Sequence, residues 1–336
     1  MKAVVIHGAN DLRLEDVPVA EPGPDQVVVR NAYVGICGSD LHYYFEGANG
    51  AFVVKEPLVP GHEMSGTIEH DPLGEWLQGT PVTLHPATFG PDVPGMEGVR
   101  HLRPGGSYLG SASTTPHTQG AMVETRVVQR DMVRLLPEGL PLRRAALAEP
   151  LAVALHSVAM AGDVSGRSLL VIGAGPIGLL TAFAALVKGA SSVSVSDVLP
   201  QPLERARALG VQHTFEVPGE AVPDNAYDVV LECTGVPVAI SSAIKACRPR
   251  GTVVQVGTVG ADPLPVVLNG VMAKELSYVG SFRFDDEVDE AVRILAEHPE
   301  VESVITHVVP ASQADEAFAV AKDSTLSGKV LVEVGA

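Results

Sequence analysis

Cysteine, aromatic residues and positive charge are all scarce in this chain of 336 residues. The chain has only three cysteines, Cys37, Cys233 and Cys247, and an odd number cannot all be paired in disulfides. This argues against a disulfide framework, so we expect a cytoplasmic protein. Lysines and arginines number 23 against 40 aspartates and glutamates, and the net charge of −17 disfavours nucleic acid because phosphates would be repelled. No apolar run reaches the length of a membrane span and no signal peptide pattern opens the chain, so we expect no membrane partner.

Hydrophobic residues make up 46% of the chain, enough for a large core, and the length favours two domains. Residues 1–150 are rich in β-branched residues punctuated by glycine and proline, which predicts strands and turns. From residue 168 apolar strands alternate with helices that end at glycine, which predicts a parallel sheet covered on both faces. Strand chemistry returns in the tail. We therefore predict an α/β protein with a β-rich domain formed by residues 1–150 and 285–336, and a doubly wound Rossmann domain at 151–284.

A glycine-rich turn follows the first strand of the α/β part. Its residues are Gly173, Gly175, Pro176, Ile177 and Gly178. The three glycines match the G-x-G-x-x-G fingerprint, a strand precedes them, a helix starts among them, and Asp197 ends the next strand. This context favours a dinucleotide site over an ordinary strand–turn–helix. Asp197 would accept hydrogen bonds from the ribose hydroxyls and repel a 2′-phosphate, so we expect NAD rather than NADP.

Two short segments carry potential metal chemistry. Cys37 stands beside Ser39 and His42, and His62 is followed directly by Glu63. A thiolate, an imidazole and a carboxylate are suitable zinc ligands, and a catalytic zinc uses three protein ligands and leaves one position open. Taken singly, each residue is more often structural. The two segments together, followed by a dinucleotide fingerprint, favour a catalytic zinc site.

The sequence resembles the zinc-dependent medium-chain dehydrogenase family, and within it the sorbitol and L-idonate dehydrogenase branch. The resemblance extends over nearly the whole chain and rests on the segments GICGSDLHYY, KEPLVPGHEMSG, GSASTTPHTQGA, EPLAVALHS, VIGAGPIGL, GSFRF and GKVLVEV. It implies a GroES-like catalytic domain formed by both ends of the chain. It also implies hydride transfer between a secondary alcohol of a polyol or sugar acid and the cofactor.

The resemblance further implies a role for individual residues. The zinc ligands would be Cys37 and His62, with Glu63 as third ligand and Glu149 either on the metal or holding its water. A proton relay would pass through Ser39 and His42, and Tyr43 and Arg283 would contact the substrate. The remaining cofactor contacts would come from Thr234, Val256, Gly257, Thr258, Ser281, Phe282 and Lys329, the last of these near the pyrophosphate.

The chain also departs from many members of this family. It has no cysteine between Cys37 and Cys233, so the usual four-cysteine structural zinc site is missing and we expect one zinc per chain. The loop segment from Gly90 to Gly106 would then be held by packing alone. Two alternatives stay open, a zinc-independent quinone reductase and a non-catalytic cofactor-binding protein. We also expect a homodimer or homotetramer formed through the apolar segment 266–281.

Overall fold

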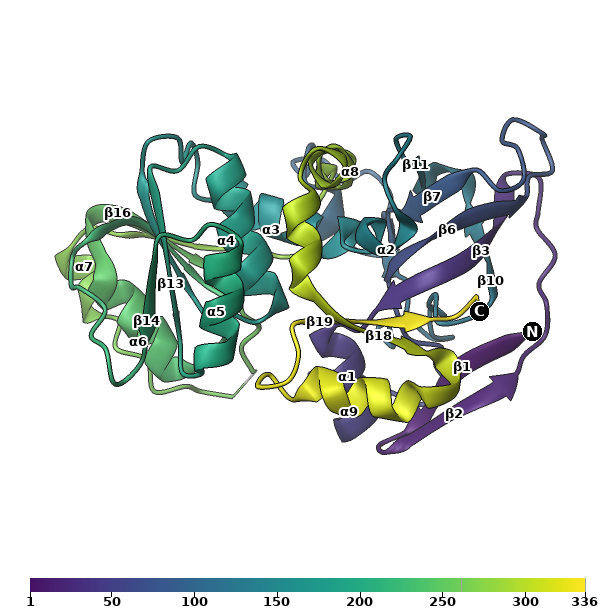
Figure 1. The fold of residues 1–336 in the computed structure, drawn as a ribbon, viewed down its shortest axis with the longest axis horizontal. Coiled ribbons are helices and arrows are strands. Elements are labelled where there is room, and N and C mark those ends of the chain that lie inside the picture. Colours follow the sequence, from purple (N-terminus) through teal and green to yellow (C-terminus); the bar gives the residue numbers. More distant parts are fainter. Residues whose placement is uncertain (261, 336) are drawn as a thin grey trace.

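The computed structural model describes residues 1–260 and 262–335. Two lobes lie side by side along the long axis of the molecule, a β-rich lobe that holds both termini and an α/β lobe (Figure 1). Among the described residues, no helix combines the length and the apolar character that crossing a bilayer requires.

The β-rich lobe is organised around a sheet of seven strands in the order β11-β7-β6-β3-β19-β18, with β10 paired to the first half of β3. These strands are β3 (Gln26–Gly35), β6 (Glu63–His70), β7 (Pro81–Leu84), β10 (Thr125–Gln129), β11 (Val133–Leu135), β18 (Ile305–Pro310) and β19 (Lys329–Glu333). Three two-stranded pairs complete the lobe, formed by β1 (Lys2–Gly8) with β2 (Asp11–Asp16), β4 (Ala48–Asn49) with β5 (Phe52–Val53), and β8 (Ala87–Thr88) with β9 (Ser107–Tyr108). The helices of this lobe are α1 (Gly38–Glu46), α2 (Leu142–Ala145) and α9 (Ala314–Lys322).

Strand β19 brings the end of the chain back to its beginning. It pairs antiparallel with β3, and both strands contribute to one core with β1 and α9. The yellow carboxyl-terminal strands therefore run beside the purple amino-terminal ones (Figure 1). This arrangement confirms the expected domain formed by both ends of the chain.

The second lobe is a parallel sheet in the order β14-β13-β12-β15-β16-β17, which is the doubly wound arrangement. Its strands are β12 (Ser168–Ile172), β13 (Ser192–Asp197), β14 (His213–Glu216), β15 (Tyr227–Glu232), β16 (Cys247–Gln255) and β17 (Ser277–Gly280). Its helices are α3 (Ala148–Ala159), α4 (Pro176–Val187), α5 (Pro200–Ala208), α6 (Pro237–Ala246), α7 (Asn269–Ala273) and α8 (Glu287–Glu297). In β12, Leu169 and Val171 enter one core while Leu170 and Ile172 enter another, so the strand is buried on both faces.

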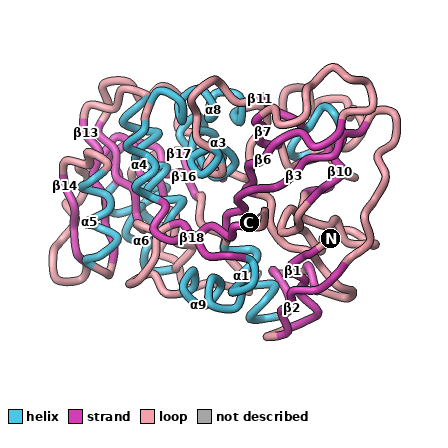
Figure 2. The backbone as a smooth tube through the Cα atoms, turned by 45° about the vertical axis from the view of Figure 1, so that its right-hand side comes forward, coloured by secondary structure: helices cyan, strands magenta, loops and turns pink. Residues whose placement is uncertain are grey.

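Pro150 lies in the first turn of α3 and does not break it, because its missing N–H would have no intrahelical partner there. Helix α8 lies beyond the expected boundary at residue 285 but packs against α3, and its apolar side chains belong to the core of the α/β lobe. The views in Figures 1 and 2 both show α8 next to α3 where the lobes meet. We propose that the α/β domain extends to about residue 304.

Candidate active site

The expected zinc ligands lie at the ends of two neighbouring strands whose register places them together. Strand β3 ends at Gly35, directly opposite Glu63 at the start of β6, and Cys37 follows in the turn before α1. A Cβ on Gly35 would lie 2.1 Å from Glu63 Oε2, so only glycine leaves room for that carboxylate. Gly61 has a φ of 94°, and a Cβ there would lie 2.6 Å from Val34 Cγ1. A side chain at either position would collide with these neighbours, so the arrangement of the site requires glycine at both.

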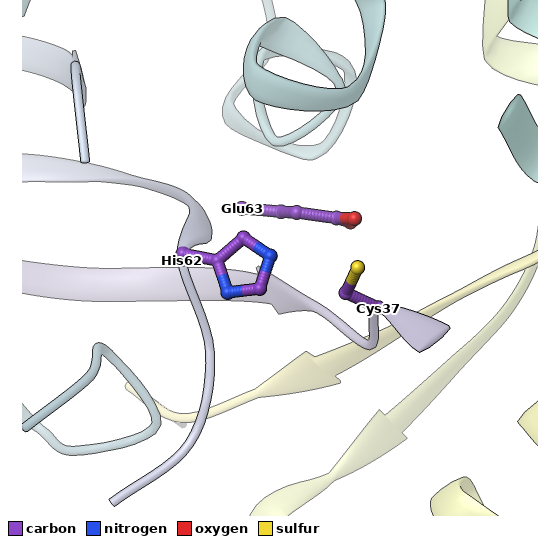
Figure 3. A group of neighbouring side chains, drawn as sticks. All are labelled: Cys37, His62 and Glu63. Carbon is purple, nitrogen blue, oxygen red and sulfur yellow. The ribbon is translucent and has the colours of Figure 1, made fainter. Parts of the chain in front are cut away.

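Cys37, His62 and Glu63 point toward one another (Figure 3), and their ligand atoms all lie within 4.8 Å of each other. All three lie inside the protein, since His62 is 6% and Glu63 0% exposed and Cys37 is half-buried. One nitrogen, one sulfur and one carboxylate donor suit zinc. The three residues thus fit the metal that the sequence predicts.

The electrostatics of this cluster also favour a cation. The pKa of His62 is raised to about 10: burial acts to lower it, but the neighbouring Cys37, Asp40 and Glu149 favour the protonated imidazole more strongly. Such a shift means that negative groups outweigh positive ones around the imidazole. A divalent ion would supply the missing positive charge.

Asp40 is a functional residue that the sequence analysis missed. Its side chain is fully buried, Oδ2 accepts the N–H of Cys37 (3.0 Å), and Oδ1 accepts the N–H of Gly61 (3.1 Å). Burial raises the pKa of this carboxyl group. One side chain therefore fixes both loops that carry ligands. The available signal was its place three residues after Cys37, where an acid caps the start of a helix.

Lys329 does not lie where the resemblance placed it. Instead of approaching the glycine-rich turn, its Nζ lies 2.7 Å from the Glu63 carboxylate and 3.0 Å from Ile36 O, and the side chain is buried. Burial acts to lower its pKa, but Glu63 and Cys37 raise the pKa above the usual value. Lys329 therefore belongs to the metal cluster, because β19 pairs with β3 beside the ligands.

Glu149 is buried in the first turn of α3 close to the cluster. Burial, reinforced by Glu63 and opposed by His62, raises its pKa. Its Oε1 accepts a hydrogen bond of 2.5 Å from the hydroxyl of Tyr108, a residue that the sequence analysis did not single out. Burial and the Glu149 charge raise the pKa of Tyr108 well above 10.0, so this hydroxyl keeps its proton. Glu149 is thus adjacent to the three-residue group but bound elsewhere.

The expected relay and substrate residues occupy different environments. Ser39 is half-buried, and His42 is exposed with its Nδ1 2.9 Å from Glu46 Oε1. Tyr43 is only 2% exposed and its hydroxyl accepts the N–H of Ala112 (3.1 Å), which makes it part of the core. Arg283 has a left-handed φ of 52°, and its guanidinium lies 4.1 Å from the centroid of the Tyr108 ring. Ser39, His42 and Arg283 are therefore more accessible than Tyr43.

The glycine-rich turn has the geometry that its pattern predicts. Gly173 has a φ of 95°, the left-handed region that glycine tolerates. A Cβ on Gly178 would lie 1.8 Å from Gly173 O, so the third glycine allows the close packing of α4 on the turn. Gly175 faces open space at the amino terminus of α4, which leaves its surroundings accessible to a phosphate. Pro176 and Ile177 form the first turn of this helix.

A cavity of about 620 Å³ opens beside this turn at the carboxyl ends of the strands. It lies at the topological switch point, where doubly wound sheets bind dinucleotides. Asp197 lines it and is held in place, since Oδ2 accepts the N–H of Ala174 (2.7 Å) and Oδ1 that of Leu199 (3.0 Å). Thr234 also lines the cavity, together with apolar side chains and with the polar or charged Glu220, Asp224, Ser242 and Lys245.

The other expected cofactor residues follow β15, β16 and β17. The fully buried Glu232 organises them, which sequence reasoning missed: its carboxylate accepts the N–H groups of Thr234 (2.8 Å) and Gly235 (2.9 Å). Val256 and Gly257 both donate their N–H to Glu232 O, and Thr258 follows in the same turn. Ser281 Oγ is buried without a partner in the described part of the chain, whereas Phe282 is 54% exposed.

Ion pairs hold the loop segment from Gly90 to Gly106 in place, whereas the sequence led us to expect that packing alone would hold it. Arg100 binds Asp285 through its Nε (2.7 Å) and its backbone N–H (3.0 Å), and it also contacts Asp286. The same guanidinium lies 4.4 Å from the Phe89 ring centroid. The loop segment is thereby joined to the residues that follow Arg283.

Comparison with known proteins identifies the family. The model of the alcohol dehydrogenase GroES-like domain matches residues 23–138, and that of the zinc-binding dehydrogenase domain matches residues 176–297. Over 345 aligned residues, the chain is 35% identical to sorbitol dehydrogenase from Bos taurus, with 98% of this chain and 95% of the relative covered. The chain is a zinc-dependent medium-chain dehydrogenase. It is therefore an oxidoreductase, as the sequence predicts.

Other members of this family agree in sequence and fold. The dehydrogenase is 32% identical to sorbitol dehydrogenase from Bacillus subtilis (strain 168) over 88% of its own length and 86% of the relative. Its structure superposes on L-idonate 5-dehydrogenase from Escherichia coli str. K-12 substr. MG1655 with a TM-score of 0.94 and 29% identity, over 99% and 97% of the two chains. The sorbitol and idonate branch assigned from the sequence motifs is thus confirmed.

Proposed function

We propose that the protein oxidises a secondary alcohol of a small polyol or sugar acid to the ketone, with NAD as the hydride acceptor. The observation that carries this proposal is the convergence of Cys37, His62 and Glu63 on one point in a protein that also has a dinucleotide cavity. The similarity to sorbitol and idonate dehydrogenases supports the substrate class.

A zinc ion held by Cys37, His62 and Glu63 would act as a Lewis acid that lowers the pKa of a substrate hydroxyl. The chain's own residues would then position the substrate and remove its proton. Ser39 stands close to Cys37 in sequence and is half-buried, whereas His42, one turn along α1, is exposed to solvent. This gradient of exposure suits a proton that leaves through Ser39 toward His42.

The cofactor preference follows from Asp197. Its carboxylate is fixed by two backbone N–H groups at the edge of the cavity, so its negative charge stays where an adenosine ribose would lie. An added 2′-phosphate would meet this charge directly. We therefore propose that NAD is preferred over NADP.

The decisive experiment is an assay of alditols and aldonic acids with both cofactors, measured by the absorbance of the reduced nicotinamide. The proposal expects zinc-dependent turnover with NAD, loss of activity in Cys37→Ala, and retention of NAD binding by that variant. Turnover of quinones that persists in Cys37→Ala would favour the zinc-independent alternative. NAD binding without turnover of any alcohol would favour the non-catalytic alternative.

We further propose that the protein is a homodimer or homotetramer of the cytoplasm. Strand β17 is the edge of its sheet, and the segment around it exposes Val267, Leu268, Met272 and Tyr278 by 38–78%. An apolar edge of this kind is protected when two copies pair. The three cysteines are unpaired, which suits a reducing compartment.

A further inference from the structure

Tyr108 contacts three components of the active site at once. It lies in β9 and is 5% exposed. Its ring and that of His62 form a T-shaped pair, with centroids 5.4 Å apart and an interplanar angle of 67°. Its hydroxyl donates to Glu149 Oε1 at 2.5 Å, and its face supports the guanidinium of Arg283 at 4.1 Å. No other tyrosine among the described residues combines these contacts.

The hydrogen bond to Glu149 affects the metal site. The buried Glu149 is close enough to His62 and Glu63 to interact with the charges of both, yet it does not belong to the group whose ligand atoms lie within 4.8 Å of each other, which is Cys37, His62 and Glu63. A hydroxyl bound to a carboxylate in a buried site is among the stronger hydrogen bonds, since one partner is charged. This bond therefore opposes movement of Glu149 toward the ion.

We propose that Tyr108 is a positioning residue that keeps Glu149 out of the set of protein ligands. Zinc would then have three ligands, Cys37, His62 and Glu63, and its fourth position would stay open, as catalysis requires. With Glu149 as a fourth ligand, the site would resemble a closed structural one. This inference rests on the proposed zinc-dependent function.

The same ring links the metal site to the substrate side. Arg283 adopts a left-handed backbone conformation that costs energy in a non-glycine residue, and its guanidinium stacks between the rings of Tyr108 and Phe282 (4.1 and 5.0 Å). Tyr108 therefore binds the Glu149 carboxylate through its hydroxyl and contacts the Arg283 guanidinium through the face of its ring. Phenylalanine would preserve the second role and remove the first.

The first test measures zinc affinity by competition with a chelator in wild type and in Tyr108→Phe. We expect Tyr108→Phe to bind zinc about tenfold more tightly, because the released Glu149 becomes a ligand. The visible spectrum of the cobalt-substituted protein should change with it, since this band responds to ligand number and geometry. Tyr227→Phe, which removes another buried hydroxyl from the α/β core, is the matched control and should change neither quantity.

A second test separates the roles of the two residues and does not depend on Tyr108→Phe folding well. In Glu149→Gln the amide oxygen still accepts the Tyr108 hydroxyl but is a poor zinc ligand. Zinc affinity should stay within about twofold of wild type, because Glu149 is not a ligand when Tyr108 is present. On the Glu149→Gln background, Tyr108→Phe should have no further effect on zinc affinity or on the cobalt spectrum.

Two results would overturn the inference. One is an unchanged zinc affinity and cobalt spectrum in Tyr108→Phe. The other is a loss of tenfold or more in the zinc affinity of Glu149→Gln, which would make Glu149 a native ligand. A wild-type protein that binds no zinc would instead refute the proposed function, so the two failures are distinguishable.

Discussion

The ion pair between Lys329 and Glu63 gives the sharpest test of how the metal site is stabilised. Its side chains are 3% and 0% exposed, and Nζ lies 2.7 Å from the carboxylate. Replacing Lys329 by methionine keeps the apolar stem but leaves the carboxylate buried without its cation. Removing one partner of a buried pair costs about 3–5 kcal/mol.

This energy can be converted to a melting temperature. At about 2.1 cal/mol/K per residue, unfolding the whole chain as one unit has an entropy of roughly 0.7 kcal/mol/K, so Lys329→Met should lower Tm by roughly 4–7 °C. That shift applies to protein freed of metal by a chelator. With zinc bound the shift should be smaller, because the ion supplies positive charge next to Glu63. By linkage, zinc should stabilise Lys329→Met more than it stabilises the wild type.

The assay is differential scanning calorimetry of both proteins, with chelator and with zinc. The control is Lys188→Met, since Lys188 pairs with Glu290 at the surface with side chains 37% and 34% exposed. Exposed pairs contribute about 0–1 kcal/mol, so this substitution should move Tm by at most roughly 1–2 °C. If Lys329→Met shifted Tm no more than the control, or if zinc failed to reduce the shift, Lys329 would not be balancing the charge of Glu63.

Four further outcomes are expected. Burial acts to raise the pKa of Glu287, but hydrogen bonds from His156 and from backbone groups lower it to about 2. Because this pKa is below that of a glutamate in the unfolded chain, the ionised Glu287 stabilises the fold above about pH 4.5. This contribution is lost as the pH falls toward 2. Glu287→Gln should therefore lower the free energy of unfolding by roughly 2–3 kcal/mol at pH 6 and show a flatter dependence of Tm on pH below 4.5; a dependence identical to wild type would disprove this. Elemental analysis should find about one zinc per chain, and none in Cys37→Ala, whereas two tightly held ions per chain would contradict the count. Asp197→Ala should weaken NAD binding roughly ten- to a hundredfold and reduce the preference for NAD over NADP in kcat/KM; an unchanged ratio would make Asp197 a mere surface acid. Met272→Glu should shift the protein toward the monomer in light scattering if the edge near β17 is the interface, and a wild-type monomer at micromolar concentration would exclude that assembly.

Local patterns made the fold and much of the site predictable. The strand, glycine turn and helix at residues 168–189 have signatures confined to neighbouring residues, and the structure reproduces them as β12 and α4. Cys37, His62 and Glu63 were expected as zinc ligands from two short motifs taken together and from the family resemblance, and the structure places their ligand atoms within 4.8 Å of one another. Motifs that carry their own chemistry are thus recoverable from one sequence.

The interactions that support the site were not predictable in this way. Lys329, Tyr108 and Asp285 act on partners far away in the chain, and their residue types are also common on ordinary surfaces. The sheet order brings Lys329 beside Glu63. The ion pair between Arg100 and Asp285 holds the loop segment 90–106, which lacks cysteines. Long-range pairing, which a single sequence does not encode in any local signal, decides these contacts.

The return of β19 into the first sheet has a consequence for biosynthesis. Lys329 and Glu63 are separated by 266 positions, so the ribosome has made nearly the whole chain before the lysine can reach its carboxylate. At about 5–20 residues per second, this interval is roughly 15–50 s. During that time Cys37, His62 and Glu63 have been translated without the strand that completes their surroundings. The nascent protein therefore leaves Cys37 and one edge of the first sheet uncovered until β19 has been made, so the β-rich domain completes its sheet later than the α/β domain that is translated in between.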